Sequence, residues 1–503
     1  MKTKKFLCFI LSILISSSAL LAACSTAKTS DTNTADTSDT AVTDASGNTE
    51  ETTQALYQIP THDYGGYNMR VLIPNHDDWA MSTIKAVAST DTGEEEENGD
   101  PLNDAIYKRN AEVEQGLNVK ITEIKVSGPE SPAKKAILAG SDDYDVVFTD
   151  SAQAGLIATQ GLYLNLDDVP GLNLDQPYWS QNANQSAQLL GKLYFTTSDA
   201  NIITNDAIWL LYFNKTILQN LGLQDPYALV RNGTWTIDAM YDMAKAATKD
   251  IDGDGKFTVK DQWGISTHSS SFLAFLEGQG EQLVQLDNTG TPNLVNPDDK
   301  FVNAFVKAHD FMDKTNGVYL PAQDGYTGST PDLNHASKTF MANMSLFCGE
   351  VLAWARTFRQ MTADFGLLPY PKYDANQSNY YTMMIDTVPA FGIPVTAPDP
   401  ERTGTFMDAF TGASSTTIIP AYYTVSLEGK FTRDEDSIEM LNIIRDGRTF
   451  DLAILYNWGG FYSALTTYGM SVSGTNPQTV FDKNSGKVND AIQKTLDAYN
   501  SMQ

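Results

Sequence analysis

Between residues 67 and 150 the sequence alternates between strand-like and helix-like patterns, which limits the possible folds more than any other feature. Residues 67–74 (YNMRVLIP) are typical of a strand, and apolar residues spaced three or four apart from 102 to 117 predict an amphipathic helix. Residues 118–126 alternate like a strand, residues 131–140 predict a short helix with Ser131 as its N-cap, and residues 144–150 (YDVVFTD) predict a buried strand. This order predicts an α/β fold with a parallel sheet covered by helices on both faces.

The ends of these strands indicate where a ligand would bind. Ligands of open parallel sheets gather at the carboxyl ends of the strands. Residues 75–79 follow the first strand and contain the polar loop His76-Asp77-Asp78-Trp79. Asp150 and Ser151 follow the third strand. We therefore expect both segments to contribute to one site.

The N-terminus has the pattern of a bacterial lipoprotein. A lysine-rich start, a short apolar stretch and small residues predict a secretory signal peptide over residues 1–23 rather than a spanning helix. Leu21-Ala22-Ala23 followed by Cys24 resembles a lipobox, in which the cysteine takes a lipid. Residues 24–57 are rich in Ser, Thr, Ala and Asp, and we expect them to form a disordered tether. These features predict a protein anchored to the outer face of the bacterial cell membrane.

Composition limits the partners of the folded part. The formal net charge is −28, which argues against nucleic acid and anionic lipid surfaces, since both attract basic proteins. Of three cysteines, Cys8 would leave with the signal peptide and Cys24 would be lipidated, so Cys348 has no disulfide partner. We expect a monomer whose stability rests on its hydrophobic core.

A set of segments resembles the extracellular solute-binding proteins of ABC importers. The segments are GDPLNDAIYKRNAEVEQGLNVKI from Gly99, YDVVFTD, GKLY at 191–194, YFNK at 212–215, GTWT at 233–236, FGLLPYPK at 365–372 and the stretch 433–451. Their order and spacing carry the resemblance, which covers nearly the whole folded part. Within that family, the segments resemble the oligosaccharide-binding members, such as maltodextrin-binding and alginate-binding proteins.

The resemblance implies a two-lobe periplasmic-binding-protein-like fold of type II, in which crossing strands join two α/β lobes. One lobe would comprise residues 58–207 plus 374–430, and the other residues 208–373 plus 431–503. The ligand would lie in the cleft between the lobes. The implied function is to bind a carbohydrate, as a small molecule or an oligosaccharide, and to deliver it to an ABC permease in the membrane.

Residues 250–261 fit a twelve-residue calcium loop. The candidate ligands are Asp250, Asp252, Asp254, the main-chain carbonyl of Lys256, and Asp261 at position 12. Carboxylates at positions 1, 3 and 5 reach a hard cation from one side, and Gly255 permits the sharp turn. The standard loop has Glu at position 12, so the shorter Asp261 weakens bidentate closure. We expect a structural calcium ion, and an acidic turn without metal is the alternative.

Aromatic and acidic side chains suggest how a sugar would be held. Sugar faces pack on aromatic rings, while sugar hydroxyls form hydrogen bonds with carboxylates. The candidate ligand-binding residues are Trp79, Asp150, Trp209, Glu350, Trp354, Asp386 and Trp458. We expect Glu350 and Trp354 after a strand at 344–347, at the start of a helix, and we assign Trp235 and Trp263 to structural roles. For each candidate singly, core packing or a solvated acid is the competing interpretation.

Catalytic motifs are absent from the sequence. The five histidines lack zinc-ligand spacing such as HExxH, and neither a GxSxG motif nor a glycine-rich phosphate loop occurs. We therefore predict a protein that is not an enzyme. A non-transport surface sensor or adhesin and a peptide-binding protein remain alternatives, and a glycan-cleaving enzyme with a carboxylate pair is the least favoured.

Overall fold

The computed structural model of the protein describes residues 57–321, 336–427, 435–469, 471 and 476–502. The signal peptide at 1–23, Cys24 and all of the tether except residue 57 lie outside the described residues. Among the helices in the described ranges, none combines the length and the apolar character needed to cross a membrane.

Four strands form the first sheet. In spatial order they are β12 (Pro389–Gly392), β3 (Val146–Asp150), β1 (Tyr67–Pro74) and β2 (Val119–Val126). Strand β1 pairs in parallel with β2 and β3, and β12 pairs antiparallel with β3. The predicted α/β fold and parallel strands are confirmed. One antiparallel edge strand is added from more than 200 residues later in the chain.

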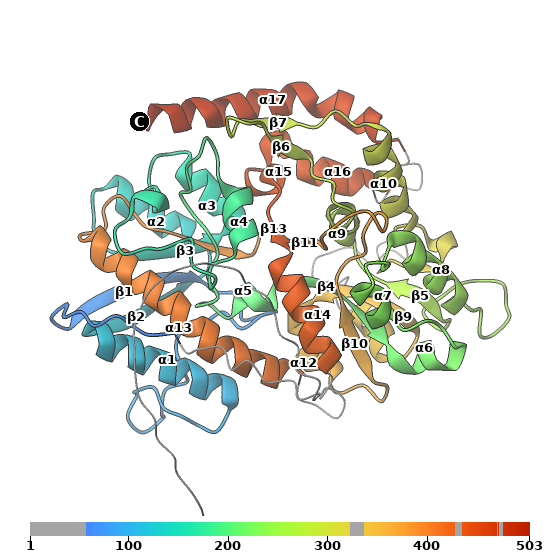
Figure 1. Ribbon diagram of the computed structural model, residues 1–503, viewed down its shortest axis with the longest axis horizontal. Helices are drawn as coiled ribbons and strands as arrows, with labels where there is room; N and C mark the ends of the chain where they lie inside the picture. The colour runs from blue at the N-terminus through green and yellow to red at the C-terminus, as the bar shows by residue number, and fades with distance from the viewer. Residues whose placement is uncertain (1–56, 322–335, 428–434, 470, 472–475, 503) are drawn as a thin grey trace, which may run out of the picture. The chain divides into compact units, whose positions relative to one another are not determined.

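Helices cover this sheet. They include α1 (Pro101–Leu117), α2 (Glu130–Leu138), α3 (Ser151–Ala158) and α13 (Pro400–Leu427). The side chain of Asp100 caps α1 by accepting hydrogen bonds from the main-chain N–H groups of Leu102 and Asn103. Helices α1 and α13 lie side by side although almost 300 residues separate them (Figure 1).

The N-terminus of α2 differs from the prediction. The helix begins at Glu130, and the preceding residue, Pro129, forms no side-chain capping bond. Ser131 is therefore inside the helix rather than its N-cap. Pro132 is tolerated because the first main-chain N–H groups of a helix have no intrahelical acceptor. Gly140 follows the helix at φ +71°, as its predicted terminating role requires.

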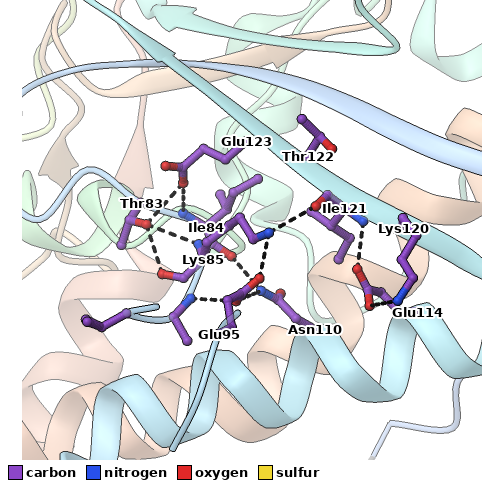
Figure 2. Close-up of polar contacts among 12 residues, drawn as sticks. Thr83, Ile84, Lys85, Glu95, Asn110, Glu114, Lys120, Ile121, Thr122 and Glu123 are labelled. Carbon is purple, nitrogen blue, oxygen red and sulfur yellow. Dashed lines mark hydrogen bonds and ion pairs between the residues drawn. The ribbon is translucent and has the colours of Figure 1, made fainter. Parts of the chain in front are cut away.

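The chain between β1 and α1 is held by half-buried acids (Figure 2). Glu123 on β2 accepts a hydrogen bond from the main-chain N–H of Ile84 at 2.8 Å. Glu95 pairs with Lys85 at 2.7 Å and accepts from the side-chain amide of Asn110 on α1 at 3.0 Å. These contacts attach the long loop between β1 and α1 to β2 and to α1.

Five strands form the second sheet. In spatial order they are β10 (Phe365–Leu368), β4 (Trp209–Asn214), β9 (Ser345–Val351), β5 (Trp263–Ser266) and β8 (Val318–Tyr319). Strand β5 is parallel to β8 and β9, whereas β4 is antiparallel to β9 and β10. Around this sheet lie α6 (Lys215–Leu221), α7 (Pro226–Arg231), α8 (Ile237–Ala247), α9 (Ser271–Gly278) and α10 (Asp299–Asp310). Trp235 and Trp263 are fully buried here, which agrees with their predicted structural roles.

Strand β9 is longer than its sequence pattern suggested. Its last residues pair with β4, with Val351 opposite Trp209 and Glu350 opposite Leu210. Glu350 is therefore inside a strand rather than at the start of a helix, because pairing with a distant strand extends β9 to residue 351. Trp354 ends a short 3-10 helix, Leu352–Trp354, that follows β9.

The remaining elements connect or flank the two sheets. They are α4 (Gln181–Ala187), α5 (Ile203–Asp206), β6 (Val284–Leu286), β7 (Pro292–Leu294), α12 (Ala355–Phe358), β11 (Thr382–Met383), α14 (Glu435–Asp446), β13 (Arg448–Thr449), α15 (Leu452–Leu455), α16 (Phe461–Gly469) and α17 (Pro477–Ser501). The strands of the first sheet come from residues 67–150 and 389–392, and those of the second from residues 209–368. The lobe boundaries themselves stay a prediction.

Candidate functional site

Two predicted segments meet at the carboxyl edge of the first sheet. Asp150 ends β3, and His76 follows the end of the neighbouring strand β1. The His76 Nε2 atom lies 2.8 Å from Asp150 Oδ1, and both side chains are partly exposed. This hydrogen bond, more than any other influence, raises the pKa of His76. The predicted meeting of the two strand ends is thereby observed.

Trp79 lies beside this pair. Its ring and that of His76 are 5.6 Å apart at an angle of 46°, and the indole is half-buried. A half-buried indole next to polar groups can offer one face to a ligand while the other packs on protein. The predicted stacking role of Trp79 is therefore compatible with its position.

Asp386 reaches the same edge from a distant part of the chain. Its main-chain carbonyl accepts hydrogen bonds from Ala152 N at 3.2 Å and Ser151 Oγ at 3.1 Å, at the start of α3. Partial burial raises the pKa of the Asp386 carboxyl, and the negative charge of Asp150 raises it further. The predicted acids Asp150 and Asp386 are thus brought together, although 236 positions separate them in the sequence.

Tyr462 was not among the predicted residues. It lies on α16, and burial followed by the charge of Asp386 raises its pKa to about 12. The side chain of Ser270, the residue that precedes α9, lies near enough to lower that pKa in part. Tyr462 therefore lies between Asp386 beside the first sheet and Ser270 beside the second. The sequence patterns pointed instead to Trp458, four residues earlier.

A second group gathers at one edge of the second sheet. Trp209 begins β4, Glu350 is near the end of β9, and His268 follows the end of β5. The rings of Trp209 and His268 are 4.7 Å apart, and His268 Nε2 lies 4.0 Å from Glu350 Oε2. Trp209 is 3%, His268 8% and Glu350 1% exposed, so the three residues form a buried cluster.

Burial disfavours the charged forms of Glu350 and His268. It raises the pKa of Glu350 to about 8 and lowers the pKa of His268 to about 3. Burial therefore favours the neutral form of both groups, which makes Glu350 a weaker acceptor than the carboxylate that we predicted. Ser337 Oγ donates a hydrogen bond to Glu350 Oε1 at 2.9 Å. The ring N–H of Trp209 and His268 Nε2 have no hydrogen-bond partner in the described part of the chain.

The last two predicted tryptophans differ in exposure. Trp354 is half-buried and stacks on Phe358, with centroids 5.8 Å apart. Trp458 is 2% exposed, stacks on Tyr456 at 5.0 Å and donates from Nε1 to Thr495 Oγ1 at 2.9 Å. Trp458 therefore packs in the core, and its indole has no open face for a ligand. This corrects its predicted stacking role.

Three of the predicted calcium ligands lie together. Carboxylate oxygens of Asp250, Asp252 and Asp254 all lie within 4.8 Å of one another. Asp261 is buried outside this group, and its two oxygens accept hydrogen bonds from the main-chain N–H groups of Ile251 (2.9 Å) and Thr258 (2.8 Å). In this conformation Asp261 closes the loop through the main chain rather than through a cation. Oxygen donors of this kind suit calcium, so the three exposed or half-exposed acids fit the ion in part.

Comparisons with known proteins identify the fold. No family model matches the sequence, and no curated protein sequence matches it. Among solved structures, a cyclo/maltodextrin-binding protein complexed with maltotetraose matches with a TM-score of 0.53 at 12% identity, over 85% of this chain and 97% of that one. A sugar transporter from Rhizobium etli in an open conformation matches with a TM-score of 0.53 at 14% identity, over 87% and 100%.

An ABC substrate-binding protein from Listeria monocytogenes in complex with cycloalternan also matches, with a TM-score of 0.50 at 13% identity over 85% and 99% of the two chains. The chain therefore has the two-lobe periplasmic-binding-protein-like fold of sugar-binding structures. Identities this low show the fold alone, and the chemistry of the site indicates the ligand.

Proposed function

We propose that this protein binds a carbohydrate without altering it and delivers it to the permease of an ABC transporter. The observation that carries the proposal is the meeting of Trp79, His76, Asp150 and Asp386 with Tyr462, which brings side chains beside the two sheets together. Ligands of α/β sheets bind at such strand ends, and solved structures that share this fold include complexes with maltotetraose and cycloalternan.

Each side chain has a chemical role in the proposal. Trp79 supplies a ring face for the C–H groups of a sugar, while Asp150 and Asp386 accept hydrogen bonds from its hydroxyls. Tyr462 can donate or accept through its hydroxyl. Trp354 is half-buried and contributes indole surface if the ligand extends toward the second sheet, whereas Trp209 is buried with Glu350 and His268.

Binding is tested by titration calorimetry with maltotriose, maltotetraose and cycloalternan. We expect saturable binding of at least one of them, with the sugar recovered unchanged. Trp79→Ala should weaken that binding several-fold, because aromatic contacts contribute about 0.5–1.5 kcal/mol. Asp386→Asn should also weaken it, while Asp91→Asn at an exposed position is the matched control. Cleavage of the sugar, or equal affinities for all the variants, would contradict the proposal.

We also propose that the N-terminus anchors the protein to the outer face of the cell membrane through a lipid on Cys24. The support is the lipobox-like sequence Leu21-Ala22-Ala23-Cys24 and the polar stretch after it. Cys24→Ala should move the protein into the soluble fraction and abolish incorporation of labelled fatty acid. Cys348→Ala is the control, since Cys348 is buried. Membrane retention of the Cys24→Ala variant would refute the lipid anchor.

The loop at 250–261 is proposed to hold a structural calcium ion between Asp250, Asp252 and Asp254, with the Lys256 carbonyl as a further ligand. Three carboxylates close together repel one another unless a cation lies among them. Chelation of calcium should lower the melting temperature, because an ion bound by the folded state alone stabilises it. Asp252→Ala should remove the response to the chelator. An identical melting temperature with and without calcium, together with no metal in elemental analysis, would exclude the ion.

A further inference from the structure

A groove of about 1030 Å³ lies away from the residues discussed so far. It runs between the segment 177–182, one face of α13 and one face of α14. Its lining consists of Pro177, Tyr178, Trp179, Ser180, Gln181, Asn182, Ser415, Ile419, Pro420, Tyr423, Thr424, Ile438, Asn442, Arg445, Asp446 and Arg448. None of the predicted ligand-binding residues is among them. Its volume is that of sites which hold drug-sized molecules.

The walls of the groove combine aromatic rings with amide side chains. The Tyr178 hydroxyl donates to Asp408 Oδ2 at 2.8 Å, which holds that ring in place. The side-chain nitrogen of Asn182 donates to the main-chain carbonyl of Asp446 at 2.6 Å, and that of Gln181 donates to the carbonyl of Gln176 at 3.0 Å. These bonds orient the amide groups before any ligand arrives. An oriented wall binds without a large loss of side-chain entropy.

The charges of the groove balance. Arg445 and Arg448 form ion pairs with the same buried carboxylate, Asp199. Arg445 also donates from a terminal nitrogen to the Tyr423 hydroxyl at 3.2 Å. When Asp446 at the rim is counted, the two arginines are balanced by two carboxylates, those of Asp199 and Asp446. The groove therefore favours a ligand without net charge, because a charged one would be desolvated with no opposite charge in excess.

One donor on the floor lacks a partner. The Nε atom of Arg445 is buried and has no hydrogen-bond acceptor in the described residues. A buried donor without an acceptor is unfavourable, so such groups in native proteins usually meet a water molecule or a ligand oxygen. Because this atom is not accessible from the groove, the choice of ligand rests on the aromatic and amide groups of the groove wall.

We propose that the groove between α13 and α14 is a second binding site, for an uncharged, hydroxyl-rich molecule of the carbohydrate class. Ring faces on Tyr178 and Tyr423 pack against the C–H face of such a molecule, and Asn442, Asn182 and Gln181 form hydrogen bonds with its hydroxyls. This site is independent of the proposed one at the strand ends, since the two share no residue.

Titration calorimetry with maltotriose, cellobiose and raffinose, and with triglycine as a peptide probe, tests the proposal. The experiment uses a Trp79→Ala background so that the strand-end site is weakened. At least one sugar should still bind, and Asn442→Leu should weaken that binding about fivefold, the loss expected for one hydrogen bond. Asn489→Leu, at an exposed position of α17, is the matched control and should have no effect.

A second variant does not depend on one hydrogen bond. Ile438 is 41% exposed on the groove wall, so Ile438→Trp should obstruct part of the groove without disturbing the core and should weaken binding there at least as much as Asn442→Leu, while binding at the strand-end site is unaffected. Unchanged melting temperatures would show that both groove variants are folded. The proposal is overturned if no sugar binds in the Trp79→Ala background, if triglycine binds there and the sugars do not, or if Asn489→Leu has the same effect as Asn442→Leu. None of these results bears on the effect of Trp79→Ala itself, which tests the proposed function.

Discussion

Trp458→Ala should lower the free energy of unfolding by about 3–5 kcal/mol, the usual cost of truncating a large buried aromatic residue. The indole is 2% exposed, packs on Tyr456 and donates a hydrogen bond to Thr495, so its removal leaves a cavity and breaks that hydrogen bond. Urea unfolding measures the change. Any protein that remains folded should bind its ligand with unchanged affinity, because this ring lies in the core.

The matched comparison is Trp79→Ala. Trp79 is half-buried in a loop, so the same truncation should cost less stability while weakening ligand binding. The reverse pattern, with Trp458→Ala stable but defective in binding and Trp79→Ala unfolded, would mean that the two roles have been exchanged. Comparing these two Trp→Ala variants therefore distinguishes a tryptophan that stabilises the core from one that contacts the ligand.

Asp206→Ala should lower the free energy of unfolding by about 3–5 kcal/mol, because it leaves the charge of a largely buried arginine without a partner. Asp206 is fully buried, and its oxygens lie 2.6 and 2.7 Å from the two terminal nitrogens of Arg356. It also accepts hydrogen bonds from the Tyr422 hydroxyl at 2.5 Å and from Met81 N at 2.6 Å. One carboxylate thus joins α12, α13 and the loop that follows β1.

Chemical denaturation of three variants tests this role. Asp91→Ala, at an exposed position, should change the stability by no more than about 0.5 kcal/mol. The double variant Asp206→Ala/Arg356→Met should recover part of the loss, since it removes the arginine charge that Asp206→Ala leaves unpaired. A loss below about 1 kcal/mol for Asp206→Ala would show that water replaces the carboxylate and that the contacts contribute little.

Local patterns predicted the elements of the first sheet closely. The strand at 67–74 and the helix ending near residue 117 lie where the sequence placed them, because the period of apolar residues reflects which side of each element is buried. Two element boundaries were predicted wrongly. The N-terminus of α2 and the end of β9 were misjudged, the first through a misassigned cap and the second because pairing with β4 extends the strand.

The candidate site was predictable in part. Asp150 and the loop holding Trp79 were found because the ends of neighbouring parallel strands meet at one edge of a sheet. Tyr462 gave no signal of its own, since a tyrosine in an apolar helix has the same pattern whether it faces a core or a cleft. The groove between α13 and α14 also gave none, because its walls come from segments more than 200 residues apart.

Local sequence patterns were enough to predict the α/β class, the strand ends that carry His76 and Asp150, and the clustering of Asp250, Asp252 and Asp254, because these depend on neighbours within a few residues. Packing between distant segments sets which tryptophans are buried, how Asp386 reaches Asp150, and why the pKa of Glu350 is raised. Burial and charge depend on what distant segments pack against a side chain, and no local pattern records that packing.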